Sequence, residues 1–290
     1  MTLTTKSKLE INLHHISTTN NKSIIKLPIL DLLNQKIKLI GVDFDGTLIH
    51  CDKTKYGSSW EVILGTCVDE KEVTLIADKY LTKLHNELEI SKREKIYEDW
   101  VKEDTLRLKG LDANQFIQNY KMPYVLGAKD FFNSMNGTFY KSIISGGINI
   151  SVEQVAAELN FDDQISTILH LDDSNKFLGT YELPLKLHGK LEYLLNLVNK
   201  LNNQKIKDTD NNLYNISPNE ICFIGDGIND LGVFKHLYAN GGLTIGINPK
   251  FDELKKYSTI MVNNYNELMN LSTQQIDYFL EQQKINEDLK

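Results

Sequence analysis

The feature that most constrains this chain is a short apolar run that recurs, each time followed at once by aspartate, serine or glycine. Such runs occupy residues 37–42, 139–144 and 221–224. The residues that follow them are Asp43, Ser145-Gly146-Gly147 and Gly225-Asp226-Gly227. A continuous apolar run is typical of a parallel strand buried on both faces, and helical spacing at 150–159 and 190–201 alternates with these runs. The pattern predicts an α/β protein with a doubly wound parallel sheet, whose ligands bind at the carboxyl ends of the strands.

The stretch between the first and second runs has a different pattern. Its apolar residues recur at helical spacing without a strand-like run, beginning with Leu75, Ile76, Tyr80, Leu84 and Leu88. We therefore expect an all-helical cap at 57–120, inserted into an α/β core made of 37–56 and 121–290. Residues 1–36 are mostly polar, with a short helical pattern at 24–33. We interpret them as an N-terminal extension outside the core.

The composition narrows the classes of function. A chain of 290 residues that is 41% hydrophobic suits one large domain, or one domain with an insert. The formal net charge of -7 argues against nucleic acid as a partner, because phosphate backbones are bound by basic surfaces. No apolar stretch approaches the length of a membrane span, and Cys51, Cys67 and Cys222 are scattered without a paired pattern. We therefore expect a cytoplasmic protein with no membrane partner.

Two carboxylates, Asp43 and Asp45, stand one residue apart where the first predicted strand ends. In unequal environments two such groups acquire different proton affinities, so Asp43 can act as a nucleophile and Asp45 as a general acid and base. A phosphoryl substrate would add negative charge to an already acidic site. A hard divalent cation with oxygen ligands is then required, and Mg2+ is the usual choice.

The later motifs supply the remaining chemistry. We expect Asp226, after the third apolar run, to be a metal ligand and Asp230 to support it. Ser145 precedes two glycines at the start of a predicted helix, and its hydroxyl and the free backbone amides suit phosphate oxygens. Lys190 is the candidate cation that neutralises a phosphate oxygen and the attacking carboxylate, with Lys186 as a competitor.

These motifs together resemble those of the haloacid dehalogenase-like (HAD) phosphatase superfamily, in its phosphoserine phosphatase-like subgroup. The matching residues are DFDGTL at 43–48, ISGG at 144–147, Lys190 and GDGIND at 225–230. The resemblance spans residues 37–262 and implies a Rossmann-like core with a helical cap. It also implies an aspartyl-phosphate on Asp43, proton transfer by Asp45, and a Mg2+ ion held by Asp43, the backbone carbonyl of Asp45, Asp226 and Asp230. The phosphate contacts that it implies come from Phe44, Ser145, Gly146, Lys190 and Asn229.

The substrate is expected to be a small phosphorylated metabolite. In the resembled enzymes a glutamate nine positions after the nucleophile holds the substrate's amino group, and here that position is Asp52. They also carry a cap arginine, where this chain has Asp104, and Arg107 one helical turn onward is the candidate substitute. Trp60 is a candidate for the wall of the substrate cleft. These departures favour a phosphomonoester other than phosphoserine.

Several alternatives remain open at the level of sequence. The chain could be a true phosphoserine phosphatase, or a phosphotransferase that uses an acceptor other than water, since both reactions share an aspartyl-phosphate. A binder of phosphoryl ligands without catalysis is the alternative from another class. No pattern in the sequence predicts the oligomeric state. The roles of residues 1–36 and of the polar segment at 202–215 are also left open.

Overall fold

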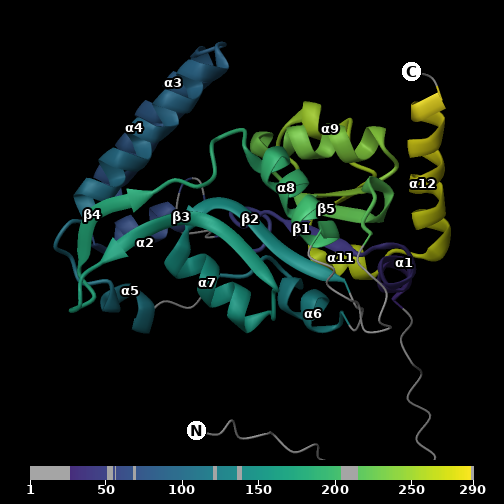
Figure 1. The fold of residues 1–290 in the computed structure, drawn as a ribbon, viewed down its shortest axis with the longest axis horizontal. Helices are drawn as coiled ribbons and strands as arrows, with labels where there is room; N and C mark the ends of the chain where they lie inside the picture. Colours follow the sequence, from purple (N-terminus) through teal and green to yellow (C-terminus); the bar gives the residue numbers. More distant parts are fainter. Residues whose placement is uncertain are drawn as a thin grey trace, which may run out of the picture.

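The chain folds around one seven-stranded sheet with helices on both faces (Figure 1). The computed structural model describes residues 27–50, 55, 57–67, 70–119, 123–135, 139–203 and 215–288. The strand order is β4-β3-β2-β1-β5-β6-β7. The bounds are β1 (Leu39–Val42), β2 (Tyr140–Ile148), β3 (Asp163–Leu171), β4 (Phe177–Glu182), β5 (Ile221–Gly225), β6 (Leu243–Ile247) and β7 (Ile260–Val262). All neighbouring strands are parallel except β3 and β4, which form an antiparallel pair.

The centre of the sheet is β1, which pairs with β2 on one side and with β5 on the other. The chain builds β2, β3 and β4 outward on the first side before it returns to add β5, β6 and β7 on the second. A crevice forms where the strand order reverses, at the carboxyl ends of β1 and β5, and open α/β sheets bind their ligands at such a point. The doubly wound α/β fold predicted from the sequence is confirmed.

The two faces of the sheet carry separate apolar clusters, because successive side chains of a strand point to opposite faces. Leu39 and Phe223 pack into one cluster, whereas Ile40, Val42 and Ile224 pack into the other. The first face is covered by α8 (Lys190–Asn203), α9 (Leu231–Ala239) and α10 (Asp252–Lys255). The second is covered by α1 (Pro28–Lys36), α6 (Ala128–Asn133), α7 (Asn149–Glu158), α11 (Tyr265–Met269) and α12 (Thr273–Asp288). The centre of the sheet is therefore buried on both sides, which explains why β1 and β5 are almost wholly apolar, whereas β4 at one edge alternates buried or half-buried and exposed residues.

The helical insertion between β1 and β2 contains α2 (Ser59–Cys67), α3 (Glu70–Asn86), α4 (Ile90–Leu108) and α5 (Asn114–Asn119), and α6 follows it before β2 begins. Figure 1 shows α3 and α4 side by side, projecting away from the sheet. Ile63 of α2 and Phe116 of α5 are fully buried in the cluster of the second face. The base of this helical insertion therefore shares the main core, while the tip carries exposed apolar residues such as Leu88.

Two expectations from the sequence need correction. The helix α1, within the predicted N-terminal extension, is not outside the core: Ile29 and Leu33 are fully buried, because they form the apolar face of an amphipathic helix against the sheet. The strand predicted at 139–144 does not stop at Ser145, since β2 continues to Ile148 and pairs there with β3. Within the described residues, no helix combines the length and apolar character that crossing a membrane requires.

Candidate active site

A cavity of about 460 Å³ opens where the carboxyl ends of β1, β2 and β5 face the helical insertion. Asp43 and Asp45 from the loop after β1, Ser145 from β2 and Asp226 from the loop after β5 all line it. Some of these residues are far apart in the sequence: Asp43 and Ser145 are separated by more than 100 positions. The parallel pairing of the three strands brings them together, because parallel strands end at the same edge of a sheet.

Asp43 is held in a buried ion-pair network. Its Oδ1 lies 2.6 Å from the Nζ of Lys190, which lies 2.7 Å from Oδ1 of Asp230. The backbone N–H of Phe44 also donates to Oδ1 of Asp43, at 2.7 Å. Burial opposes the charge of Lys190, yet Asp230 and Asp43 together hold the pKa of Lys190 above its usual value. The ammonium is therefore a permanent positive charge beside Asp43, and it leaves the second carboxylate oxygen of Asp43 available to a ligand.

Asp226 lies on the other side of Asp43. Thr47 donates its hydroxyl to Oδ1 of Asp226 at 3.3 Å, and the Nζ of Lys250 lies 3.5 Å from Oδ2. Gly46 has φ +83°, and a Cβ at this position would lie 2.3 Å from Oδ2 of Asp226. Glycine is required here, because it alone adopts this conformation without strain and leaves room for the carboxylate.

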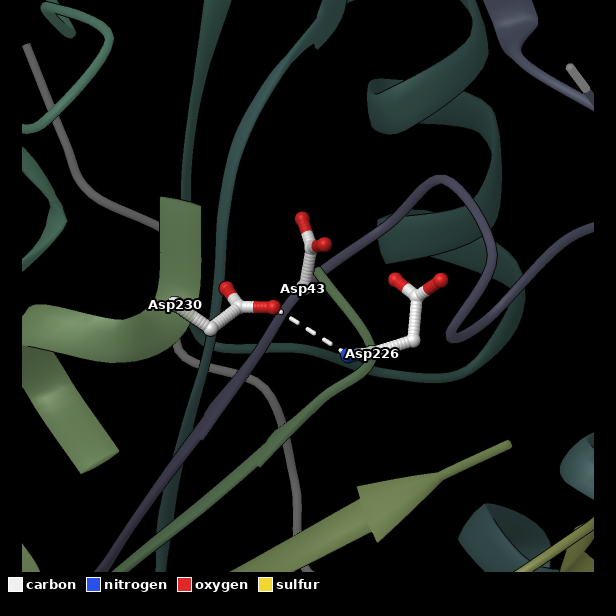
Figure 2. A group of neighbouring side chains, drawn as sticks. All are labelled: Asp43, Asp226 and Asp230. Carbon is white, nitrogen blue, oxygen red and sulfur yellow. Dashed lines mark hydrogen bonds between the residues drawn. The ribbon is translucent and has the colours of Figure 1, made fainter. Parts of the chain in front are cut away.

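The three buried carboxylates of Asp43, Asp226 and Asp230 fit a divalent cation. Each offers an oxygen within 4.8 Å of the others, and Figure 2 shows the Asp43 and Asp226 carboxylates extending side by side. Burial and the charge of Asp43 raise the pKa of Asp226 above its ordinary value, so a cation would relieve the cost of ionising it. Asp230 differs, since its Oδ1 accepts from Lys190 and its Oδ2 from the N–H groups of Asp226 and Gly227. Both of its oxygens already have donors, which suits a supporting role.

Asp45 points toward the start of the helical insertion. The backbone N–H of Ser59 donates to its Oδ1 at 2.6 Å, and the Ser59 hydroxyl donates to its Oδ2 at 3.0 Å. Burial and the charge of Asp43 raise the pKa of Asp45 to about 7, while the two Ser59 hydrogen bonds act in the opposite direction. A carboxyl group with a pKa near neutrality can both donate and accept a proton at physiological pH.

The peptide of Gly146 is fixed by the helical insertion and by β3. Its carbonyl oxygen accepts from Trp60 Nε1 at 3.1 Å, from Thr167 Oγ1 at 3.0 Å and from the Tyr97 hydroxyl at 3.5 Å. The adjacent Ser145 hydroxyl accepts the N–H of Gly147 at 3.0 Å. With the carbonyl oxygen of Gly146 held by three donors, this part of β2 has a defined orientation beside Asp43.

The other residues singled out from the sequence have different surroundings. Asn229 lines the cavity, whereas the side chain of Phe44 is fully buried and only its backbone faces Asp43. Trp60 also lines the cavity. Arg107 is not among the residues that line the cavity, and its guanidinium pairs with Glu72 and Glu103 of the insertion, so its role as a substitute for a cap arginine stays a prediction. Asp52 lies outside the described residues.

Sequence reasoning missed several residues of this site. Ser59, Tyr97 and Thr167 make contacts that no local pattern signals, since their partners are distant in the chain. Thr47 belongs to the DFDGTL segment, and its place in that motif was a usable signal. Lys250, which pairs with Asp226, follows β6, the strand next to β5. Its position after a parallel strand was the signal that could have placed it near the site.

Comparison with known proteins finds one matching family and solved structures of similar fold. The family described as haloacid dehalogenase-like hydrolase matches residues 40–235. A substrate-bound phosphoserine phosphatase has a similar fold, with a TM-score of 0.59 and 23% identity over 81% of this chain and 97% of its own. A HAD family hydrolase from Salmonella enterica serovar Typhi has a TM-score of 0.58 and 19% identity, over 79% of this chain and 68% of its own. No curated protein matches the sequence.

Proposed function

Since the chain belongs to the haloacid dehalogenase-like hydrolases, whose family description matches residues 40–235, we propose that it is a Mg2+-dependent phosphatase acting on a small phosphomonoester. The observation that carries the proposal is the buried Asp43 carboxylate, which lies 2.6 Å from Lys190 and beside Asp226. A nucleophilic carboxylate, a fixed ammonium and a cation site then surround one phosphoryl group. This combination suits phosphoryl transfer, which depends mainly on positioning and on charge stabilisation.

In the proposed reaction, the free oxygen of Asp43 attacks phosphorus while Asp45 donates its proton to the departing alcohol oxygen. The product of this step is an aspartyl-phosphate, and Asp45 then takes a proton from the water that hydrolyses it. Lys190 stabilises the negative charge that Asp43 and the phosphoryl oxygens share. Mg2+ bound by Asp43, the Asp45 carbonyl and Asp226 would supply further positive charge at the same group.

The residues around the phosphoryl group would orient it. The Ser145 hydroxyl, the amides of Phe44 and Gly146, and the side chain of Asn229 are the proposed donors. The carbonyl of Gly146 is held by Trp60, so the peptide between Gly146 and Gly147 is oriented before substrate arrives. Ser59 holds Asp45 at the entrance of the helical insertion and would keep it next to the leaving group.

The experiment is hydrolysis of an aryl phosphate with added Mg2+. We expect Asp43→Asn and the wild-type protein with EDTA to lose turnover, and Mg2+ to restore only the latter. A quenched wild-type reaction should contain a phosphate adduct on Asp43, seen by mass spectrometry of its peptide. Turnover that persists in Asp43→Asn would refute the mechanism. Added amino-acid or nucleoside acceptors would reveal phosphotransfer by forming a new phosphate ester.

The remaining expectations concern the cellular setting. We propose a small phosphorylated metabolite as the substrate, with phosphoserine as the alternative that the similar phosphoserine phosphatase structures suggest. Cys222 is a buried free thiol, which supports a reducing compartment such as the cytoplasm. Phosphoserine belongs in the substrate screen as one arm, with release of inorganic phosphate as the measurement.

A further inference from the structure

The cavity contains a second acidic feature, Asp104, which the proposed hydrolysis does not use. Asp104 lies on α4, is 4% exposed and lines the same cavity as Asp43. Its Oδ1 is buried and has no hydrogen-bond partner among the described residues. An unpaired buried carboxylate oxygen is costly, because its lost hydration is not replaced. A ligand in the cavity that offers a donor would replace it.

The basic side chains near Asp104 are already occupied. Arg107 pairs with Glu72 and Glu103, and Lys79 lies 2.7 Å from Glu103. Both act on Asp104 from a distance, and burial outweighs them and raises the pKa of Asp104 to about 7. Lys250, a basic residue that lines the cavity, pairs with Asp226. Asp104 therefore lacks a positive charge in its own part of the cavity.

The position of Asp104 along α4 separates it from the phosphoryl site. Tyr97, Trp100, Val101 and Asp104 line the cavity, which is the spacing of one helix face. Tyr97 reaches the Gly146 carbonyl, next to Ser145, a proposed phosphate donor. Asp104 lies seven residues further, roughly 10 Å along the helix axis. A substrate with its phosphate beside Asp43 would extend its other end toward Asp104.

The wall between these two points favours an organic cation. It is built from apolar side chains such as Leu64, Val73 and Ala77, with the indole of Trp100 beside them. Glu61, which is 5% exposed, adds a second carboxylate from α2. Among the described residues of α2, α3 and α4 that line the cavity, none is basic. A substrate carboxylate would meet like charge here, whereas an ammonium would meet carboxylates and an aromatic face.

We infer that the end of the cavity at Asp104 binds an ammonium group, and that the substrate is the phosphate monoester of an amino alcohol without a carboxylate. This inference rests on the proposed phosphatase function and names its substrate class. The phosphate would occupy the Asp43 end, the carbon chain would lie along the apolar wall, and Asp104 would accept a hydrogen bond from the ammonium.

The test compares phosphoethanolamine with propyl phosphate, in which a methyl group replaces the ammonium. We expect wild-type kcat/KM to be higher for the amine by about tenfold or more, the scale of a buried hydrogen bond to a charged group. Asp104→Asn should remove most of this preference and Asp104→Glu should retain part of it. The control Asp99→Asn removes a carboxylate from the same helix that does not line the cavity, and it should keep the wild-type ratio.

Further arms separate the possible outcomes. Phosphoserine should be a poorer substrate than phosphoethanolamine, and phosphocholine distinguishes a quaternary from a primary ammonium. Hydrolysis of an aryl phosphate without any preference for the amine would overturn this inference and leave the proposed function intact. If no ester is hydrolysed, the binding of phosphoethanolamine and propyl phosphate can still be compared by calorimetric titration in the presence of Mg2+. Equal affinities for the two esters would overturn the inference.

Discussion

Lys190 is the buried ammonium that lies between Asp43 and Asp230, and its removal should destabilise the fold strongly. The side-chain exposures of the three groups are 1%, 5% and 0%, so solvent screens none of them. Lys190→Met leaves two buried carboxylates without their cation. Breaking a buried ion pair from one side costs about 3–5 kcal/mol. That loss is a large part of the 5–15 kcal/mol that typically stabilises a domain.

The assay is urea unfolding at pH 7 in EDTA, for wild type, Lys190→Met and the control Lys250→Met. Lys250 also pairs with a buried carboxylate, that of Asp226, but its own side chain is 49% exposed and the distance is 3.5 Å. A solvated pair is worth at most about 1 kcal/mol, so the control should lose little. Added Mg2+ should restore part of the stability of Lys190→Met, because the cation supplies charge to the same carboxylates. Equal losses in the two variants would refute the reasoning.

Two further predictions concern single positions. Gly46→Ala should abolish phosphatase activity and weaken Mg2+ binding, measured by titration calorimetry. The residue has a positive φ, and the added Cβ would collide with the carboxylate of Asp226. The control Gly65→Ala, where nothing lies within 4 Å of the added Cβ, should stay active. Burial raises the pKa of Asp104 from 3.8 to about 7. As the pH rises, the unfolded chain therefore loses this proton at a lower pH than the folded chain does. The wild-type free energy of unfolding should fall between about pH 4 and about pH 7. Asp104→Asn should lose less over this window in a series of melting temperatures, and parallel curves would contradict the assignment.

The sequence was sufficient to predict those parts of the fold and site that depend on local patterns. Continuous apolar runs ending in aspartate, serine or glycine located β1, β2 and β5, because a strand buried on both faces has no polar positions. Their common edge then brought Asp43, Ser145 and Asp226 to one cavity, as the topology rules imply. The helical spacing of the apolar residues in the insertion likewise agrees with the helices α2 to α5 that the structure describes there.

Other features depend on contacts between distant segments and left no local signal. The antiparallel pair β3 and β4 interrupts the expected alternation of strand and helix, and α4 packs against β4. Arg107 was a reasonable candidate by register, but Glu72 from the neighbouring α3 engages it. Tyr97 and Thr167 meet at the carbonyl of Gly146 although they lie 70 positions apart. Such pairings depend on how elements pack, which a single sequence does not encode in any short window.

The central position of β1 has a consequence for how the chain is made. Its neighbours β2 and β5 begin at Tyr140 and Ile221, so β1 leaves the ribosome long before either partner strand exists. The α3 and α4 hairpin contains mostly local contacts and can close during this interval, whereas pairing across the sheet must wait for the later strands. The order of synthesis thus favours a helical segment that forms first, while the Asp43 carboxylate acquires its surroundings last.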